Sequence, residues 1–130
     1  MIRVVAAVIV KNNKILCAQR GPGKSLPYKW EFPGGKVEAN ESPKEALYRE
    51  IIEELSCRIE VGKRIEQITY TYDFGRVHLT TFYCTLIDEN PVRTEHASIK
   101  WLSPNELASL DWALADLSTV KKIEQDFSVT

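Results

Sequence analysis

The sequence predicts an α/β fold in which helices cover a mixed β-sheet. Strand-like runs lie at residues 3–10, 14–20, 58–72 and 76–87. A helical pattern at 43–55 interrupts them, and shorter helical patterns follow them. Because strands precede, interrupt and follow helices, the order of the elements predicts a mixed sheet with helices packed on it.

The first two strands are predicted to pair through a tight turn. Residues 3–10 are almost entirely valine, isoleucine and alanine, which is typical of a buried strand. Asn12 and Asn13 provide a turn signal before the run at 14–20. Residues 21–29 mix glycine, proline and lysine, so we expect a loop that carries ligand contacts.

The main helix has a clear N-terminal signal at Ser42. Ser42 is the expected N-cap, Pro43 occupies the first helical position and Glu45 completes a capping box. The apolar stripe expected to pack in the core consists of Leu47, Ile51 and Leu55, widened by Tyr48 and Ile52.

The second half of the chain begins with a predicted β-hairpin. Its strands, 58–72 and 76–87, are rich in β-branched and aromatic residues and are joined by residues 73–75. The remaining elements are expected to be a polar loop at 89–98, a strand at 99–102, a short helix capped by Ser103 and a closing helix at 118–127.

Composition predicts one domain that spans residues 1–130. The chain is 44% hydrophobic with a net charge of −1, so we expect a small-molecule partner, no long nucleic acid, and a monomer or homodimer. No basic-then-apolar leader and no run near the ~18 apolar residues of a membrane span occur, so we expect a cytoplasmic protein without membrane association. The three cysteines are far apart and odd in number, which favours reduced, buried thiols.

Three glutamates share one face of the main helix beside its apolar stripe. Glu50, Glu53 and Glu54 are three and four residues apart, and like charges at that spacing destabilise a helix by about 0.2–0.5 kcal/mol per pair. A divalent cation would neutralise them, because carboxylates suit magnesium, manganese or calcium. The alternative is an ordinary solvated acidic face.

The spacing of these acids resembles the box of the Nudix hydrolases, G-x5-E-x7-R-E-U-x-E-E-x-G-U, where U is apolar. The matching residues are Gly35, Glu41, Arg49, Glu50, Glu53 and Glu54. The two departures are Ser56, where the box has its closing glycine, and Cys57, where it has an apolar residue. Serine is costly at a helix end that favours a left-handed backbone, but neither departure removes a ligand.

The resemblance extends to the MutT-like branch of that family. Residues 30–36, WEFPGGK, look like the segment before the box, and residues 101–104, WLSP, look like a late strand and turn of that branch. The resemblance implies an α/β/α sandwich. It also implies hydrolysis of a nucleoside triphosphate to the monophosphate and pyrophosphate, with a CTP-like pyrimidine or an oxidised or methylated base preferred.

The resemblance also implies a metal site. Glu50, Glu53 and Glu54, with the main-chain oxygen of Gly34, are expected to hold Mg²⁺, for which Mn²⁺ is a possible substitute. Glu95 lies six residues before Trp101, where MutT-like members place a loop glutamate near the metals. A solvated loop glutamate is the equal alternative.

Two further roles concern catalysis. By resemblance, Glu50 is the expected base that activates water, with Glu53 next. Arg49 is expected to orient a glutamate through a charge-assisted bond, with Glu41 as its partner. The alternative for Arg49 is an ordinary surface salt bridge.

Substrate recognition is predicted from residues outside the box. Arg20 matches a nucleotide-contacting arginine of MutT-like proteins, and Lys36 is a candidate phosphate contact. Glu31 and Tyr28 are also expected to bind the substrate, and Tyr28 is a candidate stacking surface for the base. The other aromatic candidates for stacking are Trp30, Phe74 and Trp112.

Asp116 falls where MutT has a base-reading asparagine. An ionised aspartate accepts hydrogen bonds, which favours an exocyclic amine such as that of cytosine, whereas a protonated one also donates. The alternative is that Asp116 is the N-cap of the last helix. For the whole chain, the alternative functions are a nucleoside-diphosphate-sugar or dinucleotide hydrolase and a non-catalytic nucleotide sensor.

Overall fold

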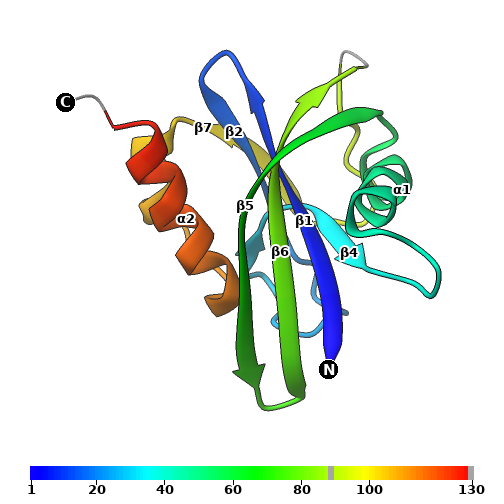
Figure 1. Cartoon of the computed structure of the whole chain (residues 1–130). Helices are drawn as coiled ribbons and strands as arrows, with labels where there is room; N and C mark the ends of the chain where they lie inside the picture. The colour runs from blue at the N-terminus through cyan, green and yellow to red at the C-terminus, as the bar shows by residue number, and fades with distance from the viewer. Residues whose placement is uncertain (88–89, 129–130) are drawn as a thin grey trace.

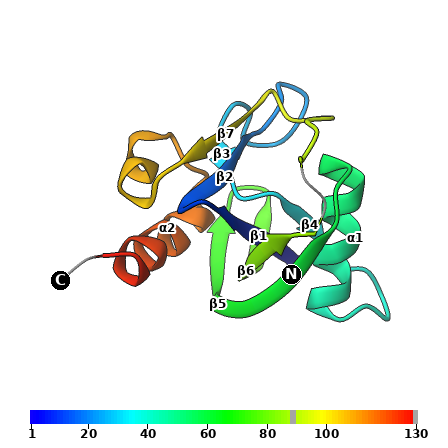
Figure 2. The same cartoon turned by 90° about the horizontal axis from the view of Figure 1, so that it is seen from above.

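The computed structural model describes residues 1–87 and 90–128, in which a mixed sheet lies between two helices (Figures 1 and 2). The helices are α1 (Pro43–Leu55) and α2 (Leu114–Asp126), and a 3₁₀ helix, η1, covers Pro104–Ser109. The strands are β1 (Ile2–Lys11), β2 (Lys14–Gln19), β3 (Trp30–Glu31), β4 (Gly34–Lys36), β5 (Ile59–Tyr72), β6 (Gly75–Leu86) and β7 (Ser98–Leu102). Within this part of the chain, no helix is long and apolar enough to cross a membrane.

The sheet confirms the predicted fold class. Its main path runs β3-β2-β1-β6-β5, while β4 pairs with β1 and β7 pairs with β2. β1 and β6 are parallel and the other pairs are antiparallel, so the sheet is mixed. The hairpin predicted at residues 58–87 is the β5–β6 pair, which is joined between Tyr72 and Gly75.

β1 is the centre of the fold because both of its faces are buried. Val5, Ala7 and Ile9 pack on the side of α1, whereas Ala6 and Val8 pack on the side of α2. Alternate side chains of a strand point to opposite faces, so one apolar run supplies two cores.

The turn predicted at Asn12 and Asn13 is confirmed. Both residues have positive φ, 52° and 62°, and the pairs Lys11–Lys14 and Val10–Ile15 close the hairpin on either side. A two-residue turn with two positive φ angles matches the right-handed twist of the paired strands, and asparagine tolerates this backbone.

The capping box of α1 is present, with Ser42 and Glu45 each bonding the other's backbone amide. The helix ends at Ser56, which is left-handed (φ 52°) and donates its amide to Ile52. Ser56 thus takes the left-handed backbone expected at the closing-glycine position of the box. A serine in this conformation destabilises the fold by roughly 1–2 kcal/mol relative to glycine. Tyr48 and Ile52 are 38% and 41% exposed, so the widened apolar stripe was wrong. Only the narrow stripe faces the sheet.

The last helix begins earlier than the sequence pattern indicated. α2 starts at Leu114 with Ala113 as its N-cap, so the N-cap reading of Asp116 is wrong. The short helix after Ser103 is a 3₁₀ helix, and the first residue of the polar segment predicted at 89–98 lies outside the described residues. The starting point of α2 places Asp116 in its first turn, facing the sheet.

The three cysteines are buried and form no disulfide within the described residues, in line with the reduced, buried thiols predicted. Burial raises the pKa of the Cys17 and Cys84 thiols to about 12, which makes them poor nucleophiles. They fill space in the two cores rather than forming a site.

A candidate nucleotide hydrolase site

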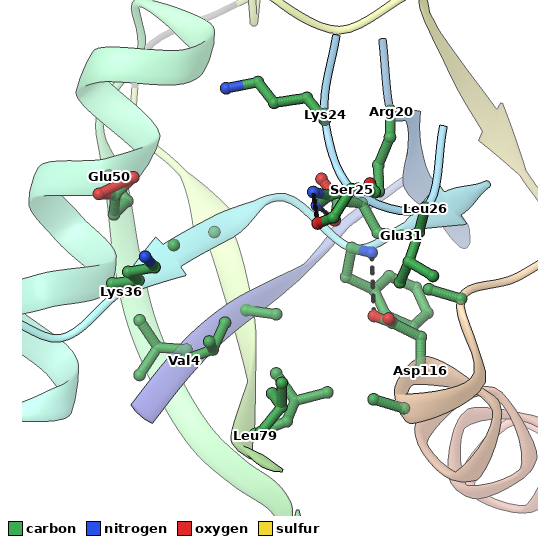
Figure 3. Close-up of a pocket in the computed structure, with 18 of the residues that line it drawn as sticks. Val4, Arg20, Lys24, Ser25, Leu26, Glu31, Lys36, Glu50, Leu79 and Asp116 are labelled. Carbon is green, nitrogen blue, oxygen red and sulfur yellow. Dashed lines mark hydrogen bonds and ion pairs between the residues drawn. The ribbon is translucent and has the colours of Figure 1, made fainter. Parts of the chain in front are cut away.

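A cavity of about 620 Å³ opens at the end of the sheet between α1 and the start of α2 (Figure 3). Its volume lies in the range of small-molecule sites. Glu50 from α1 and Lys36 from β4 lie on one side, whereas Arg20, Glu31 and Asp116 lie on the other. The structure thus brings acidic and nucleotide-contacting candidates, widely separated in sequence, around one space.

The three glutamates of α1 line this cavity, but they differ in environment. The side chain of Glu53 is 57% exposed, whereas those of Glu50 and Glu54 are 16% and 18% exposed. The Oε2 atom of Glu54 is buried, and no described residue makes a hydrogen bond to it. A buried carboxylate oxygen without a donor is costly, so this atom is suited to a cationic ligand.

Arg49 connects the acids of the motif. Its guanidinium makes a bidentate pair with Glu41, at 2.7 and 2.9 Å, and reaches Glu50 Oε2 at 2.8 Å and Glu53 Oε2 at 3.3 Å. It also donates to the main-chain oxygen of Lys36 at 3.0 Å. This pairing lowers the pKa of Glu41 to about 2 and raises that of Arg49. The structure thus pairs Arg49 with Glu41, its expected partner, and also with Glu50; that Arg49 orients a catalytic glutamate stays a prediction.

Gly34 and Gly35 form part of β4. A side chain at Gly34 would overlap the backbone of Val5, and one at Gly35 would overlap the carboxylate of Glu50. Close approach, not a positive φ, is what requires glycine at both positions. β4 consequently holds the backbone of Gly34 and Gly35 against the acidic face of α1.

Burial raises the pKa of Glu54 to about 9, and the negative charges of Glu31, Glu50 and Glu95 act in the same direction. In the absence of a cation, this carboxyl is thus neutral at physiological pH. A divalent ion and a proton then compete for the same oxygen, since metal ligands of this type bind deprotonated.

The donor set fits a divalent ion, although the side chains are not yet gathered around one point. Within residues 1–87 and 90–128, no three acidic or histidine side chains converge as a ready metal cage. Glu50 and Glu53 are instead paired with Arg49. The residues that would hold the ion are Glu50, Glu53 and Glu54, with the main-chain oxygen of Gly34, which also lines the cavity.

His96 also lines the cavity and was not identified from the sequence. It is 7% exposed, and its Nε2 atom lies 3.1 Å from Glu31 Oε2 and 3.6 Å from Glu54 Oε2. Its loop carries no motif of its own, and only its position next to Glu95 could have drawn attention to it. In contrast, His78 bonds Thr69 at 3.2 Å between the paired strands β5 and β6.

Arg20 is held on the other side of the cavity. It pairs with Glu31 Oε1 at 2.7 Å and donates to the main-chain oxygen of Ser25 at 2.6 Å. Lys24 and Glu95, also in the lining, form a longer pair at 3.5 Å, and Glu95 is 71% exposed. Glu95 therefore lies at the rim, where a solvated and a metal-facing role are both accessible to it.

Asp116 is buried at the base of the cavity. Its Oδ1 accepts the main-chain amide of Phe32 at 3.3 Å (Figure 3). Burial, with the nearby charge of Glu31, raises the pKa of Asp116 well above its ordinary value. A carboxyl that takes up a proton can donate as well as accept a hydrogen bond, and an asparagine side chain can also do both.

Of the aromatic candidates, Phe74 alone lines the cavity. It stacks on Tyr72 with an interplanar angle of 7°, and Tyr72 Oη accepts the amide of Ala115 at 2.7 Å. Tyr28 is 55% exposed and is absent from the lining, because its loop turns it outward, so the structure does not bring it to the site. Trp30 and Trp112 are buried in the core.

The raised pKa of Glu54 predicts a stability effect in the presence of a chelator. Between its ordinary pKa of 4.5 and about 9, the folded wild type binds more protons than the unfolded chain, so its free energy of unfolding falls as pH rises. Glu54→Gln has no carboxyl at this position and lacks this pH-dependent loss. The free energy of unfolding of Glu54→Gln minus that of the wild type should therefore increase by roughly 1–3 kcal/mol from about pH 5.5 to about pH 7.5, measured by urea denaturation. A stability difference between variant and wild type that does not change with pH would contradict the raised pKa of Glu54.

Comparisons with known proteins agree with this geometry. Residues 1–123 match the NUDIX domain family. CTP pyrophosphohydrolase of Escherichia coli is 37% identical over 117 residues, which cover 90% of this chain and 87% of that protein. A putative 8-oxo-dGTP diphosphatase 2 of Mycobacterium tuberculosis is 36% identical over 117 residues, which cover 87% of this chain and 81% of that protein.

Solved structures show the same relationship. DNA mismatch repair protein MutT, a Nudix hydrolase family member from methicillin-resistant Staphylococcus aureus 252 with a solution structure, is 56% identical. It has a TM-score of 0.80 and covers 96% of both chains. The Escherichia coli ORF135 protein is 35% identical, with a TM-score of 0.83, and covers 96% of this chain and 89% of that one. By the matched domain, the relatives and the motif in place on α1, the chain belongs to the Nudix hydrolase family.

Proposed function

We propose that the chain hydrolyses a nucleoside or deoxynucleoside triphosphate to the monophosphate and pyrophosphate, using Mg²⁺ or, as a substitute, Mn²⁺. The preferred base is a cytosine-type pyrimidine or an oxidised or methylated base. That the protein acts as a monomer or homodimer in the cytoplasm remains a prediction.

One observation carries the proposal: a single cavity contains an acidic end and a base-recognition end. Glu54 at the acidic end has an unsatisfied buried oxygen, whereas Asp116 at the other end is a buried polar group facing the space. Arg20 lines the cavity on the same side as Asp116 and carries a guanidinium suited to a base edge or phosphate. Phosphates directed at α1 would place the base near Asp116.

The chemistry follows from the arrangement of the acids. Water adds to phosphorus, the bond to the bridging oxygen breaks, and pyrophosphate leaves as one product. Glu50 takes the proton from water, and Arg49 at 2.8 Å fixes the direction of its carboxylate. When bound, a divalent ion supplies charge neutralisation of the phosphates and a lower pKa for the attacking water. Lys36, exposed at the mouth, is a further phosphate contact.

The base-recognition end supports both substrate classes named among the relatives. One relative is named for CTP and another for 8-oxo-dGTP. Ionised, Asp116 accepts from an exocyclic amine such as that of cytosine; neutral, it also donates to a carbonyl oxygen or ring nitrogen. Glu31 and Arg20 adjoin it and complete the set of polar groups available to a base.

The first test is pyrophosphate release from a panel of normal, methylated and oxidised nucleoside triphosphates and ADP-ribose, with Mg²⁺ and with chelator. We expect turnover of a triphosphate that chelator abolishes. Glu53→Gln should lower turnover by roughly 10–100-fold by disturbing the metal site. The variant should still fold, because Glu53 is the most exposed of the three acids. Bound nucleotide without any turnover would identify a sensor, and turnover confined to ADP-ribose would identify the alternative hydrolase class.

Asp116→Asn should change base preference on the same panel. Asparagine keeps the donor and acceptor of the neutral acid but cannot become an anion, so the ratio of kcat/KM for CTP over 8-oxo-dGTP should fall by about 10-fold. Asp111→Asn is the matched control, because Asp111 is 73% exposed and pairs with Lys29 outside the cavity. An unchanged ratio in Asp116→Asn would show that Asp116 does not read the base.

A further inference from the structure

His96 lies between the two halves of the cavity and contacts an acid from each. Glu31 is on β3 and pairs with Arg20, whereas Glu54 is on α1 among the acids of the motif. The Nε2 atom of His96 faces a carboxylate oxygen of both, at 3.1 and 3.6 Å. The shorter distance is a hydrogen bond to Glu31, and the longer one makes His96 the neighbour of the buried Glu54 oxygen.

We propose that His96 is a positioning residue that fixes Glu54 and Glu31 relative to one another, and so sets metal affinity and nucleotide affinity together. The inference rests on the proposed function, since Glu54 faces the metal and Arg20 the nucleotide. The role proposed for His96 needs no contact with the reacting atoms. His96 acts through the carboxylates that it orients.

The chain of contacts through His96 is continuous. Ser25 holds Arg20, Arg20 holds Glu31 Oε1, and His96 holds Glu31 Oε2. Both oxygens of Glu31 are thereby occupied, so its carboxylate has one orientation. On the far side, Glu54 Oε2 lacks a hydrogen bond from the described residues, and His96 Nε2 lies 3.6 Å from it. Loss of the imidazole would leave Glu54 without this neighbour and Glu31 held by Arg20 alone.

The backbone around His96 is itself fixed, which a positioning role requires. Arg93 donates to the main-chain oxygens of His96 and Ala97 at 2.8 and 3.1 Å, and the amide of Ala97 donates to Gln19 on β2. The same segment holds the end of α1, because Thr94 Oγ1 donates to the main-chain oxygen of Glu54 at 2.6 Å. The segment therefore holds both the imidazole and the residue that it faces.

The test compares His96→Leu, which fills the site without a donor, with His96→Gln, which retains an amide donor. Mn²⁺ binding to the nucleotide-free protein is measured by calorimetry, and KM and kcat are measured separately. We expect His96→Leu to weaken Mn²⁺ binding by about 10-fold or more and to raise KM, and His96→Gln to recover most of both losses. His78→Gln, outside the cavity, is the matched control and should leave Mn²⁺ binding and KM unchanged.

Three results would overturn the inference: wild-type Mn²⁺ affinity and KM in a folded His96→Leu variant, a loss of thermal stability alone, or no recovery in His96→Gln. If the leucine variant does not fold, His96→Asn replaces it. Its amide is one methylene shorter and should bind Mn²⁺ more weakly than His96→Gln; equal affinities would count against the proposal. Absence of turnover in the wild type would overturn the proposed function instead, and Mn²⁺ affinity would still decide the role of His96.

Discussion

Gly35→Ala is expected to lower kcat/KM by about 10²–10⁴-fold while the protein stays folded. The new methyl group would occupy the space of the Glu50 carboxylate, so the side chain must swing away. Glu50 would then lose its 2.8 Å bond to Arg49 and its direction toward the cavity. Loss of a correctly placed general base has an effect of this size.

Activity and stability have to be measured together to support this prediction. Steady-state kinetics give kcat/KM, and urea denaturation gives the free energy of unfolding. Gly23→Ala is the matched control, because a Cβ at Gly23 would meet nothing within 4 Å although the residue lies in the loop near the cavity. Near wild-type turnover in Gly35→Ala would mean that the position of Glu50 is not critical.

The acidic face could be predicted because it depends on a local period. Residues three and four apart on a helix share a face, and the capping box at Ser42 fixed where the helix starts. The motif therefore placed Glu50, Glu53 and Glu54 together without any knowledge of the sheet. The Asn12–Asn13 turn was predictable for the same reason, because its backbone preference is contained in the residues themselves.

Contacts between distant segments could not be predicted in this way. His96 meets Glu31 across 65 residues of sequence, and Phe32 meets Asp116 across 84. β3 and β4 have two and three residues, too few for a period of two to be recognised. The N-cap reading of Asp116 failed because Ala113, which has no capping side chain, precedes the helix. The end of the cavity at Asp116 thus depends on tertiary structure that local patterns do not contain.

The neutral state of Glu54 links the fold to metal binding. A buried carboxyl that is protonated without a cation avoids repulsion from Glu31 and Glu50. Cation binding would displace that proton, so metal affinity should rise with pH in the same range in which the metal-free protein loses stability. Protonation of Glu54 therefore reduces the charge repulsion within the acid cluster while no ligand is bound.

Gly34→Ala, in contrast to Gly35→Ala, is expected to destabilise the fold itself by about 3–5 kcal/mol. Its methyl group would overlap the carbonyl of Val5 and approach the Cα of Ala6 at 2.8 Å, and neither backbone atom can rotate away. β1 and β4 would have to separate at their Val5–Gly35 and Ala6–Gly34 pairs, in the centre of the fold. Urea denaturation should show a much lower midpoint than for wild type or Gly23→Ala, with activity lost in proportion to the unfolded fraction. A change below about 1 kcal/mol would show that β4 can shift, and would remove the argument that close packing of β4 on β1 sets the position of the site.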